Sequence, residues 1–415
     1  MSGGTRFDEL ERTIATSGSA AMLDELAASL AARGRWHGLF DVRIIQARLA
    51  IGLPPVGSPG DVPAAHRDAF DERSLAACRE AGWPLLDQGQ VAASWMYLRA
   101  AAEPAEVSAR LERVIRPLIA SAGGDAESDR ILEEALGVVL WDAADPALGI
   151  EIVLGMQGTC NAITAYEQAV ARLPAVRQRP AAAVLVTHLH DELRSNLARD
   201  VESRGVVLPA APTIPALLDA VGEADVGLHV DASHLQSVLR IARICDDEPT
   251  IRRGHDLACY ACRLPGEVVY PGEPPFENVG EASRLFYGCQ LGIDVERALR
   301  FFRGAAATAE PEAGPLPHDV LVLLLARLGR PGEALHAALT RPRDGTAMPS
   351  PLQAAAALPA LVDLAAASGE WELLRRACRN RDDEITFAAT LVAERQKTQG
   401  NCGPHGLQLP QGAAR

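Results

Sequence analysis

Residues 22–49 read MLDELAASLAARGRWHGLFDVRIIQARL, and this stretch contains the pattern that decides the fold. Apolar residues recur at helical spacing over 22–33 and again over 39–49. Gly34 lies between the two runs, and glycine readily adopts the left-handed backbone conformation that ends many helices. The stretch therefore predicts an αα-hairpin, in which two helices pack side by side across a short turn.

The same arrangement occurs three more times along the chain. Gly89 lies between predicted helices over 75–86 and 92–102, and Gly329 lies between 318–328 and 333–339. Gly369 lies between 360–367 and 372–379. Because such hairpins bury their apolar faces by stacking on neighbours, the sequence predicts an all-α fold of stacked αα-hairpins with an irregular central segment.

One of these stretches resembles a known repeat. From Gly82 through Gly89 to Ala101 and Pro104, the glycine spacing, the small residues and the closing proline are similar to a tetratricopeptide repeat, and 327–342 is a more degenerate version. The resemblance covers about a third of the chain and implies a helical-repeat solenoid, but no particular activity. An irregular all-α protein built from ordinary helical hairpins is the alternative.

Shifts in composition predict how the chain is divided. We expect an N-terminal helical-hairpin region over 1–148 and a central helical region over 149–304. A C-terminal helical-hairpin region is expected over 315–398, and a flexible tail over 399–415. Stretches that are rich in proline or glycine predict linkers at 53–62, 121–127, 305–317 and 341–351.

The composition excludes several classes of protein. The 415 residues include 73 Ala and a single Lys, Lys397, and the net charge is −14. Phosphate loops, protein kinases and Schiff-base enzymes need a specifically placed lysine amine, which Lys397 is poorly placed to supply. Nucleic acids and anionic membranes attract clustered positive charge, so neither is an expected partner of this acidic chain.

The sequence also favours a cytoplasmic protein. Residues 1–13 have no apolar core of the kind found in secretory signals. The longest apolar run, 320–326, is too short to cross a bilayer. Eight cysteines do not make a chain of this length disulfide-dense, so we expect reduced thiols. The abundance of Ala and the use of Arg in place of Lys are typical of GC-rich bacterial genes.

Histidines are concentrated in the middle of the chain. Five of the ten lie between His188 and His255, among carboxylates. They form two clusters, THLHDE at 187–192 and HVDASH at 229–234. Imidazole and carboxylate side chains that converge from two elements are typical ligands of Fe, Zn or Mn.

The first cluster is predicted to lie on a helix that starts with Pro180 at its first position and runs to about residue 204. Its buried stripe consists of Leu185, Leu189, Leu193 and Leu197. His188 and Glu192 are four residues apart on one flank of this stripe, with Asp191 nearby, and are expected to share a ligand. His190 is on the opposite flank and is expected to face solvent or a neighbouring helix.

The second cluster has two interpretations. Asp231 precedes a helical pattern and is suited to be its N-cap, with His234 in the first turn. Alternatively, His229 and Asp231 project from an extended segment and meet His234 at a metal ion. The predicted metal ligands are therefore His188, Glu192, His229, Asp231 and His234.

Further residues are candidates to hydrogen-bond the metal ligands or to line the pocket: His190, Asp191, His255, Asp256, Asn161, Phe276 and Glu277. Asn161 is equally suited to cap a helix over 162–172. Phe276 and Glu277 belong, with Glu273, to a proline-rich stretch, 271–278, that cannot be helical. Cys259 and Cys262 lack the second cysteine pair of a zinc ribbon, so helix packing is the favoured interpretation there.

Two functions of different classes follow. The first is a metal-dependent enzyme of non-haem iron oxygenase or metallohydrolase type, which acts on a small-molecule substrate at the central histidines. The second is a non-enzymatic helical-repeat scaffold that binds a partner peptide. A fully coordinated structural metal site is a third possibility.

Overall fold

The computed structural model describes residues 6–120, 125–222, 227–272, 274–308, 314–341 and 358–399. Over these ranges every regular element is a helix and there is no strand. The prediction of an all-α chain is therefore confirmed. The contacts divide the chain into two compact units, Met1–Met156 and Gln157–Arg415.

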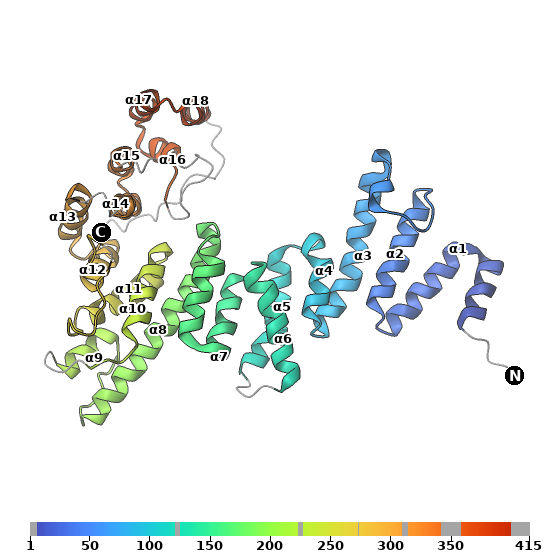
Figure 1. Cartoon of the computed structure of the whole chain (residues 1–415), viewed down its shortest axis with the longest axis horizontal. Coiled ribbons are helices and arrows are strands. Elements are labelled where there is room, and N and C mark those ends of the chain that lie inside the picture. The colour runs from blue at the N-terminus through green and yellow to red at the C-terminus, as the bar shows by residue number, and fades with distance from the viewer. Residues whose placement is uncertain are drawn as a thin grey trace. The chain divides into compact units, whose positions relative to one another are not determined.

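In the first unit, each helix packs mainly on its neighbours in sequence, with α1 on α2, α2 on α3 and α3 on α4 (Figure 1). Its helices are α1 (Arg6–Ala32), α2 (Trp36–Ala50), the short η1 (Pro59–Asp61) and η2 (Ala64–His66), α3 (Arg67–Asp87), α4 (Val91–Ala101), α5 (Pro104–Ala120), α6 (Ala126–Leu136), the π-helical η3 (Gly137–Trp141) and the first part of α7 (Pro146–Ala165). Helix α1 is interrupted by the non-helical Gly18, and α7 by Gly158, in the part of α7 that belongs to the second unit.

The second unit is also built from helices that contact their sequence neighbours, such as α11 with α12 and α14 with α15. Its elements are the π-helical η4 (Tyr166–Val170), α8 (Ala175–Ser203), α9 (Ile214–Val221), α10 (Ala232–Ile241), η6 (Ala242–Ile244), α11 (Glu248–Ala261), α12 (Val279–Gln290), α13 (Val295–Thr308), α14 (Leu316–Arg327), α15 (Pro331–Leu339), α16 (Leu361–Ser368), α17 (Trp371–Arg381) and α18 (Glu384–Thr398).

The turns between the predicted helix pairs are confirmed. The four turn glycines all have left-handed backbone angles, with φ of 65° at Gly34, 73° at Gly89, 69° at Gly329 and 80° at Gly369. A helix ends just before each glycine and another begins within two residues after it. A side chain at these positions would strain the backbone, so glycine is what allows such short connections.

The predicted leucine stripe on α8 is confirmed, because Leu185, Leu189, Leu193 and Leu197 are all fully buried. The predicted helix start was wrong, since α8 begins at Ala175 and Pro180 lies inside it. The buried Gln178 explains the earlier start. Its side-chain amide donates to two carbonyls of the preceding turn, at 3.0 Å and 2.6 Å, and its oxygen accepts from the Tyr166 hydroxyl.

The predicted linker at 305–317 was too long, because α13 continues to Thr308 and α14 begins at Leu316. The linker at 53–62 is confirmed as a segment with a single short helical turn, η1. Most of the linker at 341–351, part of the one at 121–127 and the predicted tail from 400 onward lie outside the described residues.

The longest apolar run forms most of α14, and its residues, Val320–Ala326, are all buried. Among the described helices, none is long and apolar enough to cross a membrane.

Candidate functional site

His188 and Glu192 lie together on α8, as their spacing predicts. His188 Nε2 is 3.8 Å from the Glu192 carboxylate and 3.1 Å from the Thr159 hydroxyl of α7. The side chains of His188 and Glu192 are about two-fifths exposed. The pair is therefore a surface contact that links the second part of α7 to α8.

His190 points to a neighbouring helix, one of its two expected environments. Its Nε2 lies 3.3 Å from the Asp256 carboxylate of α11, and its Nδ1 is 3.6 Å from Asp191. Both His190 and Asp256 are largely buried. This pair is an interhelical contact between α8 and α11. Asp256 therefore pairs with His190 of α8 and not with His255, its neighbour in the sequence.

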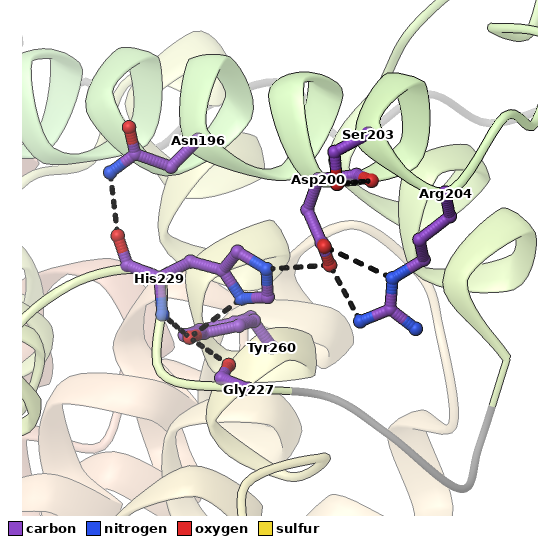
Figure 2. A network of polar contacts seen from close by, with 7 residues as sticks. All are labelled: Asn196, Asp200, Ser203, Arg204, Gly227, His229 and Tyr260. Carbon is purple, nitrogen blue, oxygen red and sulfur yellow. Dashed lines mark hydrogen bonds and ion pairs between the residues drawn. The ribbon is translucent and has the colours of Figure 1, made fainter.

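His229 is the centre of a polar network at the other end of α8 (Figure 2). Its Nε2 lies 3.1 Å from the Asp200 carboxylate, and its Nδ1 lies 3.4 Å from the Tyr260 hydroxyl. The backbone N–H of His229 donates to the same hydroxyl at 2.7 Å, and its carbonyl accepts from Asn196 at 2.6 Å. The side chains of α8 and α11 thus hold both the ring and the backbone of His229.

The charges in this network are matched. Arg204 donates two hydrogen bonds to Asp200, at 3.0 Å and 2.8 Å. The hydrogen bond from Arg204, followed by that from His229, holds the pKa of Asp200 below its usual value. Burial raises the pKa of Tyr260, so the phenol stays protonated, and its hydroxyl also donates to the Gly227 carbonyl at 3.2 Å.

The carboxylate, imidazole and hydroxyl of this network have the same order as in a proton relay. The Tyr260 hydroxyl is fully enclosed, however, and His229 is nearly so. A substrate atom therefore has no access to the hydroxyl. The arrangement acts as a clamp that fastens residues 227–229 between α8 and α11.

Asp231 is the N-cap of α10, which was one of its two interpretations. Its carboxylate accepts from the backbone N–H of Ser233 at 2.8 Å and of His234 at 3.2 Å. The hydrogen bond from the Ser233 hydroxyl, with these backbone bonds, lowers the pKa of Asp231. His234 lies in the first turn of α10.

The predicted metal ligands are thus tied to different partners: His188 and Glu192 to each other, His229 to Asp200, and Asp231 to the start of α10. In the described part of the chain, no three His, Cys, Asp or Glu side chains are grouped as metal ligands would be. The metal centre therefore stays a prediction of the sequence.

The remaining candidates are dispersed. His255 lies 3.8 Å from the Cys259 sulfur on α11, and burial lowers the pKa of His255 and raises that of Cys259 to about 11. Phe276 is buried against the rings of α13, whereas Glu277 is exposed. Asn161 is not a helix cap, because it lies inside α7 and donates to the Gln157 carbonyl. Glu273 lies outside the described residues.

The structure brings together a second set of residues that the sequence did not single out. An open groove of about 1100 Å³ runs over α13, α14, α15 and the start of α17. Its floor is apolar and includes Ala306, Leu321, Leu325 and Ala337. His318 and His336, which appear isolated in the sequence, both line this groove.

The charged side chains of the groove are mostly paired with one another. Glu333 forms ion pairs with Arg303 and with Arg330, and Arg330 also contacts Glu296 at 3.4 Å. Burial lowers the pKa of His318, which favours its neutral form. The groove therefore combines an apolar floor with a rim on which acidic and basic side chains are paired.

Comparisons with known proteins give no match: no protein-family model, no curated protein and no solved structure is similar to the chain. The function must therefore be inferred from the geometry of the chain.

The metal-centre hypothesis is open to a direct test by elemental analysis. Because His229 and Asp231 are already engaged by protein groups, we expect protein purified without an affinity tag to contain much less than one Fe, Zn or Mn per chain. A His229→Ala/His234→Ala variant should have the same metal content. Near-stoichiometric metal that is lost in this variant would instead support the enzyme.

Proposed function

We propose that this protein is a non-enzymatic helical-repeat scaffold, with tetratricopeptide-like stacked αα-hairpins, that acts in the cytoplasm. Its proposed ligand is an extended segment of a partner protein, bound in the groove over α13–α17. Three features of the chain support this function: helices that pack on their sequence neighbours, left-handed glycine turns between them, and the groove that successive helices line.

The groove is the observation that carries the proposal. Stacked helical hairpins use extended concave surfaces to bind polypeptides. The groove over α13–α17 is open, with a volume of about 1100 Å³, and residues of successive helices line it. An open groove leaves room for a polypeptide to lie along it, so we infer an extended segment as the ligand.

The chemistry of the groove indicates how such a segment would be held. Leu321 and Leu325 form the buried floor under such a segment, and the exposed Ala307 and the partly exposed Leu373 offer it apolar contacts. The Thr340 hydroxyl and the Glu370 carboxylate, which also line the groove, offer polar groups to its backbone or side chains. Binding would thus combine apolar contact with hydrogen bonds at the rim.

Ala307 provides a test of the groove. It lines the groove and its side chain is exposed, so Ala307→Trp fills part of the space without disturbing the core. We expect peptides selected from a random displayed library against the full chain to bind this variant about tenfold more weakly, which corresponds to ~1.4 kcal/mol. Fluorescence anisotropy with the selected peptides measures the difference.

The matched control is Ala28→Trp, which places the same side chain at an exposed site on α1. This variant should bind the selected peptides as the wild type does. Failure to enrich any peptide, or equal loss of affinity in both tryptophan variants, would refute the groove as the binding site.

A further inference from the structure

Helix α18 turns two of its threonines inward. Thr386 and Thr390 are buried, and the Thr390 hydroxyl donates to the Thr386 carbonyl. The large aliphatic side chains point the other way, with Ile385 69%, Leu391 45% and Val392 57% exposed. A helix at the surface of a globular unit normally buries such side chains. The orientation of α18 indicates that its apolar face has a partner.

Six exposed residues of α18 form one continuous face. At 100° per residue, positions three and four apart lie above one another, so these six residues share a single stripe. In order, they are Glu384, Ile385, Ala388, Leu391, Val392 and Arg395, and the exposed Gln396, Lys397 and Thr398 follow at the end of the helix. The centre of the stripe is apolar, with a carboxylate at its first turn and a guanidinium near its last turn. These two charges are eleven residues apart, which is about 16 Å along the helix axis.

We propose that this stripe is the contact surface of a symmetric homodimer, in which α18 of one copy packs antiparallel on α18 of a second copy. A two-fold axis midway along the stripe places Glu384 of each copy opposite Arg395 of the other. It also brings the aliphatic residues of the two stripes together. Two-fold contacts of this self-complementary kind are the commonest in homo-oligomers.

The arrangement of charges favours this occupant. Antiparallel packing forms two Glu384–Arg395 ion pairs, and the dipoles of the two helices then point in opposite directions. Parallel packing would instead place like charges next to each other. Figure 1 shows α18 at the edge of the second unit, next to α17, and its packing contacts are with α16 and α17. The opposite face of α18 is therefore accessible to a second copy.

The segment that follows α18 is a poorer fit. Residues 400–415 contain four Gly and two Pro, and Leu407 and Leu409 are their only large aliphatic residues. Prolines and glycines disfavour a helix long enough to cover the stripe. A second copy of α18 supplies a stripe of matching length and chemistry.

Analytical ultracentrifugation of the full chain at physiological ionic strength tests the proposal. One pair of helices buries a small area, so a reversible dimer with micromolar affinity is expected. Ile385→Asp/Val392→Asp should be a monomer throughout the concentration range. Val207→Asp, at a site that is 89% exposed and outside α18, should dimerise as the wild type does.

Charge reversal distinguishes this pairing from other modes of association. Glu384→Arg and Arg395→Glu should each weaken the dimer about tenfold, and the double variant should recover it, because the two pairs are then restored with opposite polarity. A wild type that is a monomer at every concentration would overturn the proposal. So would a dimer that survives Ile385→Asp/Val392→Asp, or one that is lost when residues 400–415 are deleted.

Discussion

Leu193→Ala is expected to lower the free energy of unfolding by about 2–5 kcal/mol, because it removes a fully buried side chain and leaves a cavity that the structure can only partly close. Leu193 lies in the middle of the α8 stripe, and α8 contacts α9, α10 and α11. The rigid helices around it limit collapse of the cavity. Urea denaturation followed by circular dichroism measures the change.

Val176→Ala is the matched control, since Val176 lies on the same helix but is 69% exposed. Alanine also has the higher helix propensity, so this variant should differ from the wild type by no more than about 0.5 kcal/mol. A loss below about 1 kcal/mol for Leu193→Ala would mean that α8 is not part of a close-packed core.

The helices were largely predictable, because their signals are local. Spacing of apolar residues and a glycine that ends the helix are properties of a few adjacent residues, and both hold at Gly34, Gly89, Gly329 and Gly369. The start of α8 was not predictable in this way. It depends on Gln178, whose amide reaches carbonyls of the previous turn and the Tyr166 hydroxyl, and these contacts exist only once the chain has folded.

The candidate site was predictable only within single helices. The proximity of His188 and Glu192 follows from their spacing of four residues. The partners of His229 do not, because Asp200 and Tyr260 come from helices on either side of it in the sequence. One signal was available: Asn196 and Asp200 of α8 and Arg204, its C-cap residue, recur every four residues and so lie on one face.

The groove could not be predicted from the sequence at all. Its lining residues come from α13, α14, α15, α16 and α17, so they are spread over about seventy positions of the sequence. His318 and His336 belong to different helices of one predicted hairpin, yet their spacing gives no indication of a shared surface. The two histidines come to line the same groove only through the packing of successive helices.

Tyr260→Phe is expected to destabilise the clamp around His229 by about 1–3 kcal/mol, because it leaves buried polar groups without partners. The hydroxyl accepts the His229 backbone N–H at 2.7 Å and donates to the Gly227 carbonyl at 3.2 Å, and the variant loses both bonds. The aromatic ring is retained, so packing is unchanged. Urea denaturation gives the total effect, and hydrogen exchange of residues 227–234 shows whether this segment loosens first.

Tyr270→Phe removes the same atom from a tyrosine that is 63% exposed, and it should change stability by less than about 0.5 kcal/mol. Combining Tyr260→Phe with Asp200→Asn tests whether the two partners of His229 act together. If the imidazole transmits the effect of one to the other, the two changes will not add. The free energy of unfolding lost by the double variant should then be smaller than the sum of the two single losses by at least about 0.5 kcal/mol. Strict additivity would mean that Asp200 and Tyr260 hold residues 227–229 independently, each through its own bond.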